Sequence, residues 1–257
     1  MSADALPTTR RDFVTHLGLG GVALAASACA RAVTPATTAA PVAPTAQQPA
    51  VSAPAAVPAA PRTPPVPLPP TSGDGPWDMS WLERTAKAKH ALVFDVGAYQ
   101  NGGGLFYAKN FLNGMRDGWG ASAPEVMPIM GISGDAYPIV FNDAIWAKYG
   151  YGASSKTTDV RTGEIAVRNV WWQPKPTEGM GEFGVDVLQG RGAQFLLCNN
   201  VFRGVIRRAM NQTKWGYAET RAELLVGLLP GVIVVPAIVA AMAMAQSAGA
   251  SYVVAGV

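Results

Sequence analysis

The chain has 257 residues, of which 49% are hydrophobic and only 14% charged, a balance that excludes a wholly disordered protein. Its formal net charge is +3, and from residue 77 onward 16 Lys and Arg stand against 14 Asp and Glu. A charge this small argues against a concentrated basic face, so we expect no nucleic-acid partner. Cys29 and Cys198 are the two cysteines, too few for a disulfide framework.

Residues 1–30 have the pattern of an export signal. The adjacent Arg10 and Arg11 precede an uncharged stretch at 13–28 that is rich in Leu, Gly, Ala and Val and ends in small residues. Paired arginines, a weakly apolar run and a small-residue cleavage zone are typical of the twin-arginine route, which carries folded proteins. A short amphipathic or membrane-anchoring N-terminus is the alternative. We therefore expect an extracytoplasmic protein, in the periplasm or cell envelope.

The residues before Cys29 leave the processing of this signal open. Residues 25–29 read Ala-Ala-Ser-Ala-Cys, which resembles a relaxed lipobox, in which the cysteine is lipidated and becomes the mature N-terminus. A strong lipobox has Leu three places before the cysteine, where this chain has Ala26. Cleavage after Ala28 or Ala30 is the alternative. We thus expect membrane association only through a lipid anchor at Cys29.

Residues 31–76 hold 13 of the 21 prolines and only three charged residues. Proline at this density removes backbone donors and blocks both helix and sheet, so the segment predicts a disordered, extended Ala/Pro-rich tether. Low-complexity drift with no spacing role is the alternative. The chain then divides into a signal at 1–30, a tether at 31–76 and one folded domain at 77–257.

The folded domain begins with alternating strand and helix patterns. Residues 90–96 form a short apolar run that ends before Gly97, which predicts a buried parallel strand. After a glycine-rich turn, residues 105–119 predict a helix, and residues 126–132 predict a second strand.

Pro138 is expected to open a second helix that Gly150 ends. The apolar residues of this helix recur every fourth position, which places them on one face. Residues 151–182 are irregular, with a hairpin expected around Thr162–Gly163. The periodic residues of the helix are Phe141, Ile145 and Tyr149.

Residues 183–189 predict a short helix, and residues 193–197 a third strand. Val201, Val205 and Ala209 share one face of the next helix, which is expected to place Arg203 and Arg207 together on another face.

The uncharged stretch 224–245 is long enough to suggest a membrane span. Pro230 and Pro236 break it into pieces that are too short to cross, so we expect a helix ending near Gly227, a strand at 232–235 and a helix after Pro236. A closing strand is expected at 252–254. The pattern predicts a three-layer α/β sandwich around a five-stranded, mainly parallel sheet.

Ligands of such a sheet bind beyond the carboxyl ends of its strands. His90 falls at the opposite edge and His16 lies in the signal, which weighs against a Ser-His-Asp or Cys-His hydrolase. One usable cysteine and one misplaced histidine cannot build a typical zinc site, so we expect no metal and no cofactor.

Two loops are expected at the carboxyl edge, residues 99–104 and residues 133–135. The first could present backbone N–H groups to an anion at a helix N-terminus. Its spacing is neither the dinucleotide fingerprint nor a P-loop, and a tight structural turn is the alternative. Its candidate binding residues are Asn101, Gly102, Gly103 and Gly104.

Cys198 is the candidate catalytic residue because it ends the third strand and directly precedes a helix. The helix dipole and nearby cationic groups stabilise a thiolate at such a position. Asn199, Asn200 and Arg203 follow as candidate binding residues. A small hydrophobe that is buried at the end of a strand is the alternative for Cys198.

Three segments of the domain resemble the DsrE/DsrF-like family over residues 89–254. They are residues 192–200 (GAQFLLCNN), residues 229–237 (LPGVIVVPA) and an Ala-Gln-x-x-Gly-Ala-x-Tyr pattern that ends at Tyr252. The resemblance implies a five-stranded parallel fold, assembly as a homo-oligomer, either a trimer or a hexamer, and in some members a persulfide-carrying cysteine, whose position Cys198 matches. Sulfur-relay members are typically cytoplasmic and more compact, whereas this chain has an export signal and a long insertion.

Two functions follow from these observations. The first is a sulfur carrier or sulfurtransferase in which Cys198 exchanges sulfur with a small sulfur species or a thiol protein. The alternative is a non-catalytic, oligomeric binding or scaffold module tethered in the cell envelope, with a ligand surface formed by loop 101–104 and the Trp171–Trp172 pair.

Overall fold

The computed structural model describes residues 74–256, which belong to the second of two compact units of the chain, Val66–Val257. The expected export signal with Arg10 and Arg11, the lipidation candidate Cys29 and all but the last residues of the expected tether lie outside the described residues.

Five parallel strands form a single sheet in the order β4-β3-β2-β1-β5. The expected five-stranded parallel α/β architecture is thereby confirmed. Continuous apolar runs placed the strands well, and the bounds predicted for β1, β2 and β4 agree with the structure. The strands are β1 (His90–Val96), β2 (Val126–Ile132), β3 (Gln194–Cys198), β4 (Val232–Val235) and β5 (Ser251–Gly256).

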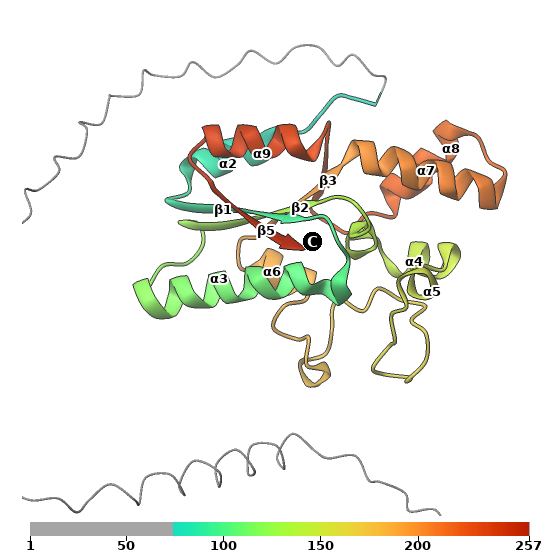
Figure 1. Cartoon of the computed structure of the whole chain (residues 1–257), viewed down its shortest axis with the longest axis horizontal. Coiled ribbons are helices and arrows are strands. Elements are labelled where there is room, and N and C mark those ends of the chain that lie inside the picture. Colours follow the sequence, from blue (N-terminus) through green and yellow to red (C-terminus); the bar gives the residue numbers. More distant parts are fainter. Residues whose placement is uncertain (1–73, 257) are drawn as a thin grey trace, which may run out of the picture. The chain divides into compact units, whose positions relative to one another are not determined.

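Helices cover both faces of this sheet (Figure 1). The chain steps from β1 to β2 to β3 in one direction, so right-handed crossovers put α3 and α6 on the same face. The crossover from β4 to β5 runs back across the sheet and puts α9, with α2 beside it, on the other face. The helices are α2 (Ser80–Lys87), α3 (Gly103–Trp119), α4 (Asp143–Tyr149), α5 (Tyr151–Ser155), α6 (Val185–Gly190), α7 (Asn199–Thr213), α8 (Tyr217–Val226) and α9 (Ile238–Ser247).

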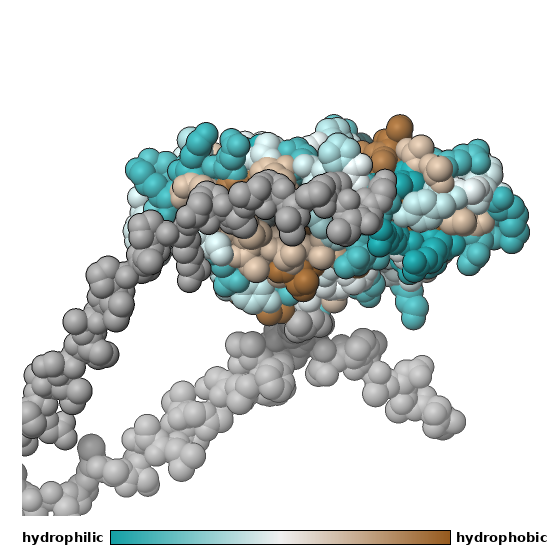
Figure 2. Space-filling view, turned by 90° about the horizontal axis from the view of Figure 1, so that it is seen from above, coloured by the Kyte–Doolittle hydropathy of each residue, from teal (hydrophilic) through white to brown (hydrophobic). Residues whose placement is uncertain are grey.

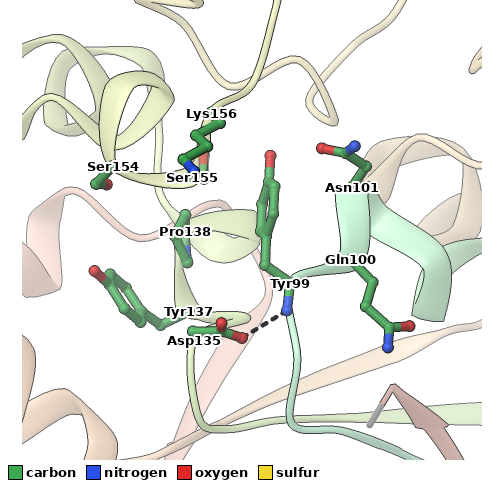
Figure 3. A pocket seen from close by; sticks show the side chains of 9 residues that line it. All are labelled: Tyr99, Gln100, Asn101, Asp135, Tyr137, Pro138, Ser154, Ser155 and Lys156. Carbon is green, nitrogen blue, oxygen red and sulfur yellow. Dashed lines mark hydrogen bonds between the residues drawn. The ribbon is translucent and has the colours of Figure 1, made fainter.

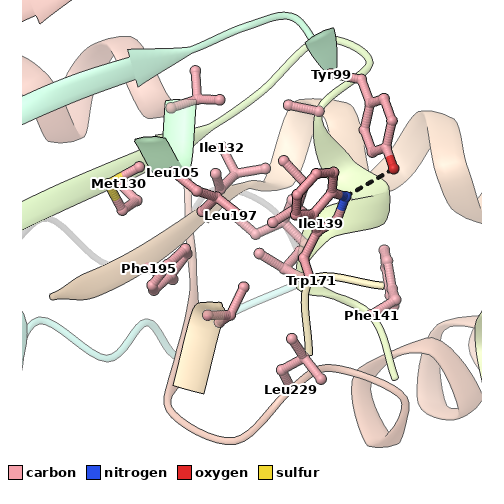
Figure 4. Close-up of a cluster of buried hydrophobic side chains, with 14 of the residues drawn as sticks. Tyr99, Leu105, Met130, Ile132, Ile139, Phe141, Trp171, Phe195, Leu197 and Leu229 are labelled. Atoms are coloured by element: carbon pink, nitrogen blue, oxygen red, sulfur yellow. Dashed lines mark hydrogen bonds between the residues drawn. The ribbon is translucent and has the colours of Figure 1, made fainter. Parts of the chain in front are cut away.

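Each face of the sheet has its own buried cluster. The larger one joins the sheet to α3, α6 and α7, and Figure 4 shows part of it around Leu105, Ile132 and Phe195. The smaller one lies under α2 and α9 and includes Trp81, Ile129 and Cys198. All seven residues of β2 are buried, as expected for a central strand covered on both faces.

The surface in Figure 2 is mixed: hydrophilic residues gather at the end where α7 and α8 lie, and hydrophobic residues form smaller patches nearer the middle.

The helix that was predicted to begin at Pro138 begins later. Residues Tyr137–Val140 form a 3₁₀ turn, and Phe141 is extended. α4 begins only at Asp143, because the Oδ1 of Asn142 accepts a hydrogen bond of 3.1 Å from the backbone N–H of Ile145. This side-chain cap outweighs the four-residue apolar period on which the prediction was based.

Residues 151–182, which we call the insertion because they exceed the compact fold that the resemblance implies, are more ordered than their composition suggests. The insertion begins with α5, which the sequence reading missed, and continues into the expected hairpin, where Thr158 and Ile165 form an antiparallel bridge. Arg168 binds both carboxylate oxygens of Asp159, at 2.7 and 2.8 Å. Helix α2 was also missed.

The apolar stretch at 224–245 forms the end of α8, then β4, then most of α9, as the prolines predicted. Among the described residues, no helix has the length and apolar character needed to cross a membrane.

Candidate functional site

A polar pocket of about 370 Å³ opens at the carboxyl ends of β1 and β2 (Figure 3). Three chain segments form it: the loop after β1, the loop after β2 and the end of α5. Its lining residues are Tyr99, Gln100, Asn101, Asp135, Tyr137, Pro138, Ser154, Ser155 and Lys156.

The two strand loops are fastened to each other. β1 and β2 end in register, with Val96 beside Ile132. The backbone N–H of Asp135 donates to the carbonyl of Gly97 at 3.0 Å, and Asp135 Oδ1 accepts from the backbone N–H of Tyr99 at 2.7 Å. Gly134, the residue before Asp135, has φ +51°, and a Cβ on it would overlap the carbonyl oxygen of Gly97. The close approach of the two loops therefore requires glycine at position 134.

A buried hydrogen-bond network fixes the Tyr99 side chain beside the pocket. Trp171 Nε1 donates to the Tyr99 hydroxyl at 2.8 Å (Figure 4), and the Thr157 hydroxyl lies 2.8 Å away on the other side. Burial raises the pKa of Tyr99, against the opposing effect of these hydrogen bonds, so the hydroxyl stays protonated at neutral pH. The network ties the insertion to the loop after β1.

Three lining residues other than glycine have left-handed backbone conformations. Gln100, Asn101 and Lys156 have φ values of 37°, 47° and 54°. Such conformations cost free energy and persist only where the surrounding structure holds them. The pocket presents hydroxyl, amide, carboxylate and ammonium groups from fixed segments. Its described lining contains neither His nor Cys, and its chemistry suits recognition of a small polar molecule.

Of the four candidate binding residues at 101–104, one lines the pocket and three are glycines that allow close packing or begin α3. Asn101 lines the pocket. Gly102 has φ +73°, and a Cβ there would lie 2.8 Å from the Trp171 ring. Gly103 begins α3, and a Cβ on Gly104 would lie 2.7 Å from Val96.

Two of the three pocket segments were predicted from the sequence. The loops after β1 and β2 were both expected at this edge, and the structure brings Asn101 and Asp135 to one pocket. The segment Ser154–Lys156 was missed because it carries no motif and reaches the pocket only through the fold of the insertion.

Cys198 lies at the same edge of the sheet but outside this pocket. Its side chain is only 6% exposed and belongs to the core cluster under α2 and α9. It ends β3 and is the residue before α7, and its Sγ accepts a hydrogen bond of 3.4 Å from the backbone N–H of Ile238, the first residue of α9. The N-terminus of α9 therefore donates to the sulfur, whereas the side chain makes no capping hydrogen bond to α7.

Asn199 and Arg203 are brought together on Asp74. Asn199 Nδ2 donates to Asp74 Oδ2 at 3.1 Å, and Arg203 Nε donates to the same oxygen at 2.6 Å. The hydrogen bond from Asn199, followed by that from Arg203 and the charge of Arg221, holds the pKa of Asp74 below its usual value despite burial. Asn200, in contrast, is exposed.

Among residues 74–256, no group of three or more His, Cys, Asp or Glu side chains is placed to hold a metal ion. Comparison of the chain with protein-family models, with curated proteins and with solved structures found no match.

Proposed function

We propose that the domain is a non-catalytic binding module for a small, hydroxyl-rich ligand, held in the cell envelope by its tether. The observation that carries the proposal is the convergence of three fixed segments on one polar pocket at the carboxyl ends of β1 and β2. Hydroxyl groups of a ligand can donate to Asp135 and accept from Asn101 and Lys156.

The rigidity of the pocket supports binding. The loops after β1 and β2 are joined by backbone hydrogen bonds, and the Tyr99 network joins them to the insertion. A site that is ordered before the ligand arrives loses little conformational entropy when it binds.

The expected homo-oligomer remains part of the proposal. β5 is an edge strand, and Tyr252, Val253 and Val254 on it are exposed. Exposed apolar side chains on an edge strand favour association. Light scattering after size exclusion would show a trimer or hexamer, and a monomer at micromolar concentration would contradict this part.

The binding proposal is tested with Asn101→Gly in the full chain. Glycine accepts the left-handed backbone at this position, so the change removes the amide and preserves the loop. A panel of neutral monosaccharides is titrated by calorimetry, and the sugar that binds is expected to bind at least about tenfold more weakly to the variant, because it loses one hydrogen bond to the ligand.

Lys214→Gly is the matched control, because Lys214 also has a positive φ, 64°, and lies at the end of α7 away from the pocket. It should bind the sugar as the wild type does. Failure of every sugar to bind, or equal losses in the two variants, would contradict the proposal.

A second function, sulfur transfer of the DsrE-like type, is favoured by the hydrogen bond from Ile238 to the Cys198 sulfur. In this reaction the Cys198 thiolate attacks the sulfane sulfur of thiosulfate, sulfite leaves, and a persulfide forms. A second thiolate then takes the outer sulfur, and the Cys198 thiolate is released.

Mass spectrometry of the chain after incubation with thiosulfate tests this function. One extra sulfur on the peptide that contains Cys198 is expected, with none in Cys198→Ala. If the Cys198 peptide never gains sulfur, sulfur transfer by this residue is ruled out.

A further inference from the structure

The carboxylate of Asp74 fills a cationic site at the start of α7. We propose that Asn199, Arg203, Tyr217 and Arg221 form a binding site for an external monocarboxylate with a short aliphatic tail, and that Asp74 occupies this site as an internal substitute for the ligand. This site is distinct from the pocket at the ends of β1 and β2.

The contacts on Asp74 are those of a bound ligand. Its side chain is 8% exposed, and its Oδ2 accepts from Asn199 and Arg203. The Tyr217 hydroxyl donates to Oδ1 at 3.3 Å, and Arg221 Nε lies 3.6 Å from the same oxygen. Both carboxylate oxygens are thus bound, by side chains from two helices that follow β3. The site accepts a carboxylate with charge-assisted hydrogen bonds.

Asp74 does not saturate this site. Two guanidinium groups face one carboxylate, so one positive charge remains, and the N-terminus of α7 adds to it. Among the described residues, the buried atoms Arg221 Nη1 and Asn199 Oδ1 have no hydrogen-bond partner. A buried donor without a partner costs free energy, and a ligand carboxylate can accept from Arg221 Nη1, whereas Asn199 Oδ1 is an acceptor and gains no partner from it.

The surroundings of Asp74 indicate what the rest of the ligand is. A groove of about 590 Å³ begins at the segment 74–78 and at Arg221. Its remaining lining is aliphatic, so a molecule with a carboxylate head at Arg221 would place a hydrocarbon tail along this lining. The aliphatic lining residues are Leu225, Leu228, Leu229, Val232, Ile233 and Val234.

An internal ligand lowers the apparent affinity for an external one. If Asp74 occupies the site about nine-tenths of the time, only one-tenth of the molecules can bind, and the apparent dissociation constant is about tenfold larger than the intrinsic one. Removing the Asp74 carboxylate should therefore strengthen external binding.

The test titrates hexanoate into the full chain and its variants by calorimetry. We expect Asp74→Ala to bind hexanoate at least about tenfold more tightly than the wild type. Asp74→Asn, which keeps the shape and loses the charge, should fall between the two. Adding Arg203→Gln to Asp74→Ala should remove the gain.

Asp117→Asn is the matched control. It makes the same chemical change on α3, where Asp117 is exposed and paired with Arg116, and it does not line the groove. The control should bind hexanoate as the wild type does. Inorganic phosphate and acetate are titrated in parallel and should bind more weakly than hexanoate, since neither carries a tail that fits the groove.

Three results would overturn the proposal. In the first, Asp74→Ala and Asp74→Asn, both folded by circular dichroism, bind hexanoate no more tightly than Asp117→Asn. In the second, the gain survives Arg203→Gln. In the third, phosphate binds Asp74→Ala as tightly as hexanoate does. If Asp74→Ala does not fold, the comparison of Asp74→Asn with Asp117→Asn decides the question.

Discussion

The thiol of Cys198 combines two properties that usually occur apart. The backbone N–H of Ile238, at the start of α9, donates to its sulfur, whereas its burial in the core keeps reagents away. Accessibility and not intrinsic nucleophilicity is therefore expected to limit its reactions in the native state.

We predict that iodoacetamide alkylates Cys198 at least about tenfold more slowly in the native chain than in urea, because the thiol must become exposed before it reacts. Mass spectrometry of the peptide that contains Cys198 separates its reaction from that of Cys29. Equal native and denatured rates would show that the sulfur is open to solvent and would strengthen the sulfur-transfer candidate.

At the level of secondary-structure elements, the first turn of α3 packs very closely on β1. A Cβ on Gly104 would lie 2.7 Å from Val96, which is fully buried in β1. A Cβ on Gly114, farther along the same helix, would meet nothing within 4 Å.

We therefore predict opposite effects of the same substitution on one helix. Gly114→Ala should raise the free energy of unfolding by up to about 1 kcal/mol through helix propensity alone. Gly104→Ala should lower it by about 1–2 kcal/mol, because overpacking against Val96 exceeds that gain. Urea denaturation followed by circular dichroism measures both, and a stabilised Gly104→Ala would mean that α3 does not pack on β1 in this way.

The insertion hairpin depends on a buried ion pair. Asp159 and Arg168 have side chains that are 7% and 13% exposed. Burial acts to raise the pKa of Asp159, but hydrogen bonds from Arg168 and from the backbone N–H of Arg161, with the charges of both arginines, hold it below its usual value. Two further acidic groups act on these arginines: Glu178 is bound to Arg161 and lies 3.6 Å from Arg168, and the charge of Asp143 also acts on Arg161.

We predict that Asp159→Asn lowers the free energy of unfolding by about 3 kcal/mol at pH 7, because Arg168 loses its buried partner. A carboxyl whose pKa is lowered on folding stabilises the native state above its unfolded pKa, and this contribution fades as the pH falls through the folded value. The difference from wild type should therefore shrink below the ordinary Asp pKa of 3.8. Denaturation curves across pH check this, and a pH-independent difference would contradict it.

Asp117→Asn is the control for this prediction. The Arg116–Asp117 pair is exposed, so its loss should produce no comparable destabilisation at any pH.

The elements differ in how well the sequence predicted them. Strands β1 and β2 are apolar runs between turn residues, and such local patterns carry their own boundaries. The predicted start of α4 at Pro138 was wrong, because the side-chain hydrogen bond that caps the helix at Asn142 leaves no trace in the apolar periodicity.

The residues of the candidate sites also differ in how well the sequence predicted their positions. Asn101 and Asp135 could be placed at one edge because parallel strands end together, whereas Lys156 and Asp74 reach their sites through contacts distant in sequence. Asp74 did offer one usable signal, since it is the sole acidic residue among residues 31–76.

At the scale of the whole molecule, residues 74–78 connect the folded domain to the chain that precedes it. Asp74 binds Asn199, Arg203, Tyr217 and Arg221, so this junction is part of the domain.

We predict that a chain beginning at residue 79 melts about 5 °C below one beginning at residue 66, because it loses the charge-assisted hydrogen bonds of Asp74. Differential scanning calorimetry of the two chains measures the difference. Identical midpoints would show that the Asp74 contacts contribute nothing to stability.

The position of Asp74 also decides how the domain would respond to mechanical load. A pull on the chain ahead of residue 74 reaches the ion pairs with Arg203 and Arg221 before it reaches α2. Tension would thus be applied first to α7 and α8, which follow β3, the strand that ends in Cys198. Tension on this chain would then draw the Asp74 carboxylate out of its site while the sheet stays intact, so occupancy of the proposed carboxylate site at Arg221 would be sensitive to force.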